Sequence, residues 1–197
     1  MRPTMSIAAS SVAHARELID RGIAADGTHP LGTAYLVRTG DAARDVRATS
    51  YPQARDALAG RVEVKLEHAA GVTGRSGVMF YFIGSVEVPG IEDNTYLPGA
   101  VADHLTSAGG VLGGGDQMSS LRWLEAGVTG TYGTVVEPCN LAGKFPSPSL
   151  LMDRYARGET LVESYWKSVA MPGQGIFIGE PLAAPYAGAR RAARERL

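Results

Sequence analysis

The sequence predicts an α/β fold in three layers, with a mainly parallel sheet covered by helices on both faces. Strand-like and helix-like segments alternate along the whole chain. Residues 78–83 form an all-apolar run bounded by glycines, as expected of a central strand covered on both sides. Two other apolar runs, 97–102 and 133–136, each lead into polar side chains. That pattern is typical of strands that build a site at one edge of an open sheet.

The other elements follow from side-chain periodicity and from residues that start or stop helices. A helix is expected to begin after Ser11 and to end at Gly27, and a second helix starts at Pro52 and stops at Gly60. Residues 62–67 alternate with period two, which indicates a half-exposed strand near the sheet edge. Further strands are expected at 5–8, 33–37 and 175–178, and further helices at 117–126, 149–158 and 160–169.

Size and composition favour a single domain over residues 1–197, either a complete protein or a fragment of a longer one. With 19 basic and 20 acidic residues, the chain has no overall field that would draw it to nucleic acid. The one local excess of charge is the basic tail at 187–197, which is expected to be solvated.

The chain has one cysteine, so it has no internal disulfide, and no apolar run approaches the roughly 20 residues of a membrane span. No secretory signal is visible in the first residues. The cytoplasm is therefore the default compartment, and export is expected instead if an amino-terminal portion precedes this chain. No cofactor is expected, and self-association is expected if strands are missing, because an open sheet edge tends to pair.

Polar residues at the carboxyl ends of the predicted strands define the candidate site, because those ends meet at one edge if the sheet is parallel. The members are His68, Ser85, Asp103, His104, Glu137, Cys139 and Glu180.

Two chemistries are open for this set. A dyad of Cys139 and His104 would make a thiolate nucleophile, although a single cysteine is more often a small buried hydrophobe and Glu137 disfavours a thiolate. A metal site would use four candidate ligands, Asp103, His104, Glu137 and Cys139. The spacing of these residues is not diagnostic of a metal site. Because Asp103 and His104 are adjacent and point to opposite faces of a strand, no metal is assigned.

The glycine-rich loop at 109–115 suggests either phosphate binding or a flexible connector or lid. Nucleotide fingerprints need their glycines directly between a strand and a helix, with a Lys-Ser/Thr pair or a later acidic residue. Neither pattern is complete here, so the connector or lid is the expectation.

Three segments resemble an uncharacterised bacterial family found in genomes that carry the exosortase protein-sorting system. These segments read PGAVADHLTS, SSLRWLEAGVTGTYGTVVEPCN and GETLVESYWKSVAMPGQGIFIGEPLAAPY. The resemblance covers nearly half of the chain closely and the rest loosely. Family members are usually longer at the amino end, which implies that this chain is a short form or a carboxyl-terminal portion.

More distantly, the order of elements is similar to the gingipain branch of the caspase-like cysteine peptidases. In this resemblance Gly84 and Ser85 replace the turn that holds the catalytic histidine, and Asp103 and His104 replace the segment of the catalytic cysteine. The Gly-Asp-Pro element becomes Gly-Glu-Pro, with Glu180 at its centre. The resemblance therefore implies a caspase-like fold whose catalytic positions are substituted.

The resulting expectation is a non-catalytic or divergent caspase-like domain that binds a protein or peptide partner, linked to protein export or surface assembly. The alternative is a cysteine-dependent hydrolase whose site lies around His104 and Cys139. Substituted catalytic positions favour the binding domain, because fold similarity alone does not establish an enzyme.

Overall fold

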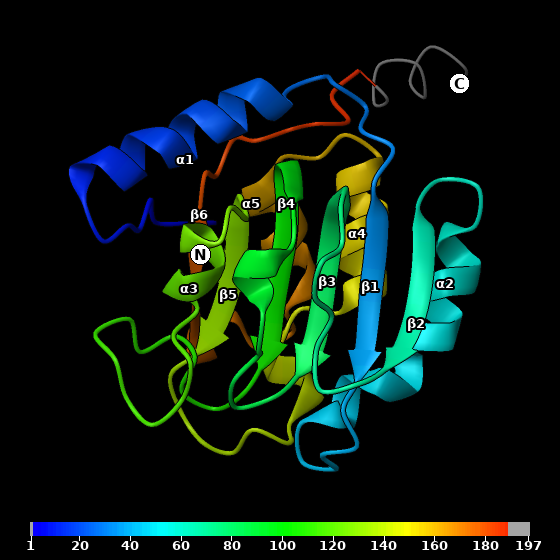
Figure 1. The fold of residues 1–197 in the computed structure, drawn as a ribbon, viewed down its shortest axis with the longest axis vertical. Helices are drawn as coiled ribbons and strands as arrows, with labels where there is room; N and C mark the ends of the chain where they lie inside the picture. Colours follow the sequence, from blue (N-terminus) through cyan, green and yellow to red (C-terminus); the bar gives the residue numbers. More distant parts are fainter. Residues whose placement is uncertain (1, 189–197) are drawn as a thin grey trace.

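The computed structural model describes residues 2–188 and shows an α/β fold built on a six-stranded mixed sheet (Figure 1). The strand order is β2-β1-β3-β4-β5-β6. Neighbouring strands from β2 to β5 run parallel, and β6 runs antiparallel to β5. The strand bounds are β1 Thr33–Arg38, β2 Glu63–His68, β3 Val78–Gly84, β4 Tyr96–Leu105, β5 Gly130–Thr134 and β6 Gly175–Gly179.

Helices cover both faces of the sheet, which confirms the expected layering (Figure 1). On one face lie α2 (Tyr51–Leu58), α4 (Pro148–Ala156) and α5 (Leu161–Ser168). The opposite face carries α1 (Val12–Ala25) and the short α3 (Leu121–Glu125). No helix in the described part of the chain has both the length and the apolar character needed to cross a membrane.

The two larger hydrophobic clusters lie on opposite faces of the sheet, and β3 contributes to both. Its seven residues are all buried, as the apolar run predicts. Phe80 and Phe82 pack on the α2 side with Tyr155, whereas Tyr81 packs on the other side against Trp123 at 5.1 Å between ring centroids. This burial on both faces fixes β3 and its neighbour β4 as the rigid centre of the molecule.

Helices α1 and α5 both begin at side-chain caps, and the capping residue of α1 is the predicted one. The Ser11 side chain accepts a hydrogen bond from the backbone N–H of His14 and so caps α1, and Thr160 with Glu163 forms a capping box on α5. The strand expected at residues 5–8 is reduced to one bridge, in which Ser6 pairs with Ile178 of β6.

Three strands differ from the sequence prediction in ways that matter for the site. Strand β5 ends at Thr134, so the exposed Val135 and Val136, which were expected within it, lie in the loop that follows. Strand β4 continues to Leu105, so Asp103 and His104 lie inside it rather than beyond its end. The reversed direction of β6 places its carboxyl end at the opposite edge of the sheet, because Gly179 pairs with Gly130 at the start of β5. Of the predicted basic tail at 187–197, residues 189–197 lie outside the described residues.

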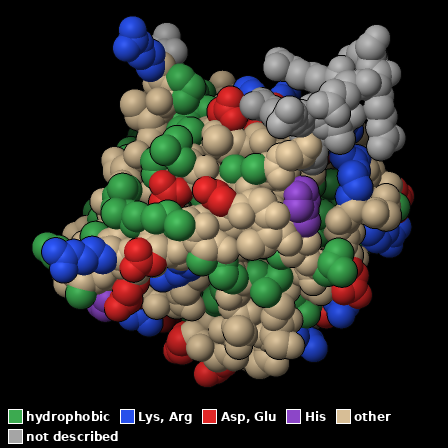
Figure 2. Space-filling model, turned by 90° about the horizontal axis from the view of Figure 1, so that it is seen from above, with side chains coloured by type: hydrophobic (Ala, Val, Ile, Leu, Met, Phe, Trp, Pro, Cys, Tyr) green, Lys and Arg blue, Asp and Glu red, His purple; other side chains and the backbone are tan. Residues whose placement is uncertain are grey.

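The end of the molecule that holds the amino ends of the parallel strands is shown in Figure 2. Acidic and basic side chains are interspersed there with apolar ones, and neither charge forms a continuous field. This mixture matches the near-balance of charges in the sequence.

Candidate functional site

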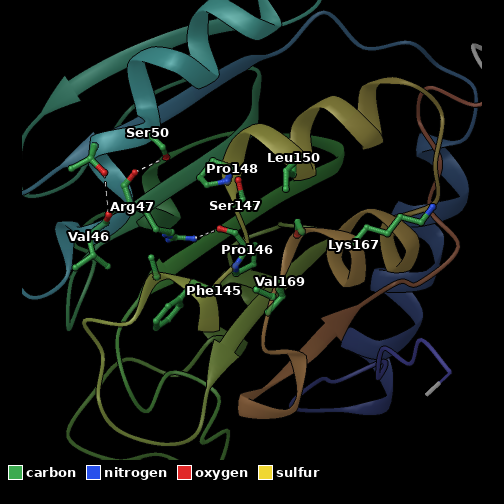
Figure 3. A pocket seen from close by; sticks show the side chains of 15 residues that line it. Val46, Arg47, Ser50, Phe145, Pro146, Ser147, Pro148, Leu150, Lys167 and Val169 are labelled. Carbon is green, nitrogen blue, oxygen red and sulfur yellow. Dashed lines mark hydrogen bonds between the residues drawn. The ribbon is translucent and has the colours of Figure 1, made fainter.

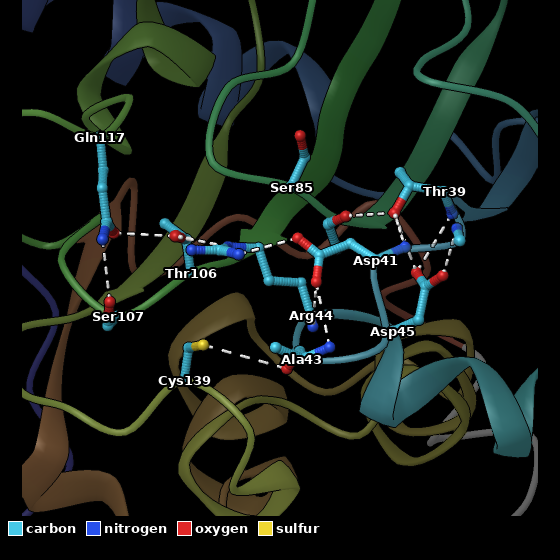
Figure 4. A network of polar contacts seen from close by, with 12 residues as sticks. Thr39, Asp41, Ala43, Arg44, Asp45, Ser85, Thr106, Ser107, Gln117 and Cys139 are labelled. Carbon is cyan, nitrogen blue, oxygen red and sulfur yellow. Dashed lines mark hydrogen bonds and ion pairs between the residues drawn. The ribbon is translucent and has the colours of Figure 1, made fainter.

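The carboxyl ends of β1, β3, β4 and β5 meet at one edge of the sheet, where polar side chains from separate loops form a connected network (Figure 4). Thr106 and Ser107 follow β4 directly, and Thr134 ends β5. The Thr134 hydroxyl contacts the carbonyl oxygens of Thr106 and Ser107 at 2.7 and 2.9 Å. These contacts join the ends of the two strands, so the edge is a rigid platform.

Gln117 ties the loop that precedes α3 to the end of β4. Its Oε1 accepts hydrogen bonds from the Thr106 hydroxyl at 2.8 Å and from the backbone N–H of Ala108 at 2.7 Å. Its Nε2 donates to the Ser107 hydroxyl at 2.9 Å. The Gln117 side-chain amide thus holds three consecutive residues directly after β4. The Thr106 and Ser107 hydroxyls are both engaged in these structural contacts.

A second part of the network comes from the loop after β1. The Arg44 guanidinium contacts the Asp41 carboxylate at 2.8 Å and the Thr106 hydroxyl at 3.3 Å. Arg44 lowers the pKa of Asp41, mainly through their side-chain hydrogen bond. The pair is partly exposed and locally neutral, so it joins the loop after β1 to β4 without adding net charge to the edge.

His104 lies fully buried beneath the network and both of its ring nitrogens are occupied. Trp123 donates its indole N–H to Nδ1 at 3.0 Å, and Nε2 lies 2.9 Å from the carbonyl oxygen of Met118. Because indole is only a donor, the proton of the neutral ring sits on Nε2 and is donated to Met118. Burial lowers the pKa of His104 to about 4, so the ring is neutral near pH 7.

Above His104 a polar groove of about 530 Å³ opens between the loop that follows β3 and the loop that precedes α3. Met118 joins these loops, since its backbone N–H donates to the carbonyl oxygen of Val86 at 3.0 Å. Exposed carboxylates line the groove at Glu87, Glu92 and Asp116. The lining guanidinium, Arg122, is 3.8 Å from the Glu125 carboxylate, which leaves the groove with an excess of negative charge.

Asp103 occupies the other face of β4 and is also fully buried. Its Oδ1 lies 2.6 Å from Nη2 of Arg47, which comes from the 3-10 helix Asp45–Ser50. Burial raises the pKa of Asp103, and the Arg47 guanidinium opposes that rise. Arg47 also donates to the carbonyl oxygens of Pro146 and Ile83, both at 3.2 Å. The pair therefore holds the 3-10 helix against the sheet.

A mainly apolar hollow of about 370 Å³ opens beside Arg47 (Figure 3). Its walls include Val46, Phe145, Pro146 and Val169, and Lys167 lies at its rim. Because Asp103 neutralises the Arg47 charge, this hollow offers an apolar surface rather than a site for an anion.

Cys139 lies beside the network on the loop after β5, with intermediate exposure. Its thiol makes a weak contact with the carbonyl oxygen of Ala43 at 3.9 Å (Figure 4). The exposed Glu137 precedes a cis peptide bond to Pro138 on the same loop. The buried Lys144 ammonium donates to the carbonyl oxygens of Val136 and Pro138 and so shapes this loop.

The structure does not assemble the predicted site residues into one cluster. Ser85 stands at the common edge, where its hydroxyl donates to the carbonyl oxygen of Glu87. His68 ends the outermost strand β2. Glu180 lies beside Thr129, at the end of the sheet where the parallel strands begin. The expectation that Glu180 shares the carboxyl edge is wrong, because β6 is antiparallel.

The geometry does not support a dyad of His104 and Cys139. Both imidazole nitrogens are engaged by Trp123 and Met118, and no hydrogen bond joins the ring to the thiol within residues 2–188. A general base must reach the proton that it removes, and a fully buried ring held on both sides cannot do so without local unfolding. His104 instead positions the floor of the groove.

The positions of the His, Cys, Asp and Glu side chains do not support a metal site in the described part of the chain. Within residues 2–188, no group of three or more His, Cys, Asp or Glu side chains is arranged to hold a metal ion.

Sequence reasoning did not single out Gln117, Arg47 or the carboxylates of the groove. Gln117 and Arg47 have partners 11 and 56 positions away in the chain, and neither residue carries a local pattern that names its partner. The groove carboxylates gave a weak signal, since they flank glycine-containing loops after two predicted strands.

The chain matches no protein-family model, no curated protein and no solved structure.

Proposed function

We propose that this protein is a non-catalytic domain that binds an extended, basic peptide segment of a protein partner in the groove between Glu87 and Asp116. The observation that carries the proposal is the groove itself. It lies beside the carboxyl ends of β3 and β4, where open α/β sheets bind their ligands, and its floor is held rigid from below.

Charge selects the partner's chemistry. Three exposed carboxylates face the groove, and its arginine is already close to Glu125. Lysine or arginine side chains of a peptide would be attracted to this surface, and an acidic peptide would be repelled.

Two resemblances support the wider assignment. In the sequence, Gly84 and Ser85 stand where such a domain has its histidine turn, and Gly179, Glu180 and Pro181 stand where it has its closing Gly-Asp-Pro element. We propose a caspase-like domain whose catalytic positions are substituted. The resemblance to a family from exosortase-carrying genomes supports a partner among exported or surface-assembled proteins.

Fluorescence anisotropy with labelled dodecapeptides tests the binding. We expect a lysine-rich peptide to bind more tightly than an uncharged or glutamate-rich one, and its affinity to fall as salt is added. Glu92→Lys and Asp116→Lys should each weaken binding roughly fivefold. The matched control is Asp20→Lys on α1, which makes the same charge change outside the groove and should leave affinity unchanged. Equal binding by the control and the groove variants would refute the proposed site.

A cysteine-dependent hydrolase is the alternative, and iodoacetamide separates it from the binding domain. A catalytic thiolate would be alkylated rapidly near neutral pH, and the reaction would slow sharply in His104→Gln. The binding domain predicts slow alkylation of Cys139 with little dependence on His104, together with unchanged peptide affinity after alkylation.

A further inference from the structure

The two edges of the sheet differ in whether a further segment covers them. At the β6 edge, Ser6 exchanges backbone hydrogen bonds with Phe177 and Gly179, at 3.0 and 2.9 Å. At the other edge β2 pairs with β1, and its outer side pairs with no strand within residues 2–188 (Figure 1). The backbone of Glu63–His68 is therefore a template for another strand.

Side chains of β2 divide cleanly between the two faces of the sheet. Leu66 stands beside Leu36 of β1 on the α2 side, and 38% of its surface is exposed. On the opposite face, Lys65 lies over the Tyr35 ring with its ammonium 5.9 Å from the ring centroid. Because side chains alternate along a strand, Val64 and His68 accompany Leu66, whereas Glu63 and Glu67 accompany Lys65.

We propose that two copies of this chain associate through antiparallel pairing of their β2 strands, with Leu66 at the two-fold axis. In that register Lys65 of each copy lies opposite Glu67 of the other, so the two-fold axis creates two opposite-charge pairs. The two Leu66 side chains meet on the α2 face. Such cross-strand pairs are the contacts that stabilise antiparallel strands.

Repulsion between like charges on β2 disfavours most other symmetric registers. A two-fold axis at Lys65 would place two lysines opposite each other and Glu63 opposite Glu67. An axis at Glu67 would place two glutamates opposite each other. An axis at Val64 matches charges but requires residues 60–62 to pair as strand. Gly60 has a φ of 78° and Val62 is only 7% exposed, so these residues are not available as an edge.

The contacts that β2 already makes do not oppose this pairing. Lys65 lies 3.5 Å from Glu63, and Glu67 lies 3.9 Å from Arg75, in both cases between exposed or half-exposed side chains. Such surface pairs contribute little to stability and can be shared or exchanged. Beside Leu66, a hollow of about 450 Å³ lined by Leu36, Tyr51 and Pro52 leaves room for apolar side chains from the second copy.

Charge reversal tests the register. Sedimentation velocity of the full chain should show a dimer, and Lys65→Glu and Glu67→Lys should each raise the dimer dissociation constant by roughly tenfold or more. An equimolar mixture of the two single variants should dimerise again, because each would supply the charge that the other lacks. The double variant Lys65→Glu/Glu67→Lys should also recover dimerisation. A monomeric wild type, or single variants that dimerise like the wild type, would overturn the proposal.

Disulfide trapping tests the axis directly, in a Cys139→Ser background that removes the native thiol. Leu66→Cys should give a disulfide-linked dimer under mild oxidation, because only the residue on the axis meets its own copy at disulfide distance. Val64→Cys is the matched control on the same face and should remain monomeric under denaturing electrophoresis. Cross-linking through position 64 rather than 66 would refute the Leu66 register, and cross-linking through neither would refute the pairing.

Discussion

Asp103 and His104 are neighbours in β4 and both are fully buried, yet the two faces of the sheet treat them differently. On the α2 side, Asp103 forms an ion pair with Arg47 beside an apolar hollow. On the α3 side, His104 is kept neutral between Trp123 and Met118 beneath a polar groove. A buried polar residue is thus charged or neutral according to its partner, and each residue supports the surface above it.

The largest expected effect comes from removing the charge on the Asp103 side. Asp103→Asn would leave the Arg47 guanidinium buried without a counter-charge, and we expect a loss of about 3–5 kcal/mol in the free energy of unfolding. Urea denaturation followed by circular dichroism measures this loss. Asp56→Asn breaks an exposed pair with Arg55 and should change stability little, so it is the matched control. A small loss for Asp103→Asn would show that the buried pair is not a structural support.

A smaller effect is expected from acid on the His104 side. The folded-state pKa of His104 is about 4, below the 6.5 of an unperturbed histidine, so the unfolded chain takes up a proton first as the pH falls. Stability from this residue is present above pH 6.5 and is lost as the pH drops toward 4, by about 3 kcal/mol in total.

Unfolding curves at several pH values give the slope. His104→Gln should flatten it between pH 6.5 and 4, whereas substitution of the exposed His14 by Gln should not. An unchanged slope in the His104 variant would mean that this ring titrates alike in the folded and unfolded chains.

The smallest effect on stability is expected at Gln117, where the groove loop meets the end of β4. Gln117→Ala removes three hydrogen bonds from a partly exposed side chain, and we expect a loss of roughly 1–2 kcal/mol. Hydrogen exchange should accelerate in residues 115–119, and peptide affinity should fall more than stability does. Gln53→Ala on α2, which makes the same change at an exposed residue away from the groove loop, is the control. Protection equal to the wild type would mean that Gln117 does not hold the loop.

Much of the fold could be predicted because local sequence patterns identify several of its helices and strands. The all-apolar run of β3, the alternation of β2 and the capping residues of α1 and α5 each identify an element without reference to the rest of the chain. Parallel pairing then follows from helices placed between strands. The direction of β6 could not be predicted, because the segment 135–174 contains two helices and its length permits either direction.

The site was less predictable because its residues are defined by distant partners. The sequence pattern puts Asp103 and His104 at the end of a strand because polar residues usually leave the core. Arg47 and Trp123 allow both to be buried within β4. Those partners come from a polar loop and from a short helix, and no local pattern links them to β4. The groove depends on the same distant contacts.

A nitrogen-detected NMR titration of the His104 ring in the folded protein tests most directly whether this ring is a buried support of the groove. We expect a neutral ring with its proton on Nε2 and a pKa of about 4, and we expect that pKa to rise in Trp123→Phe, which removes the donor to Nδ1. A ring that titrates near pH 6.5, or that carries its proton on Nδ1, would contradict the role of His104 as a buried support of the groove.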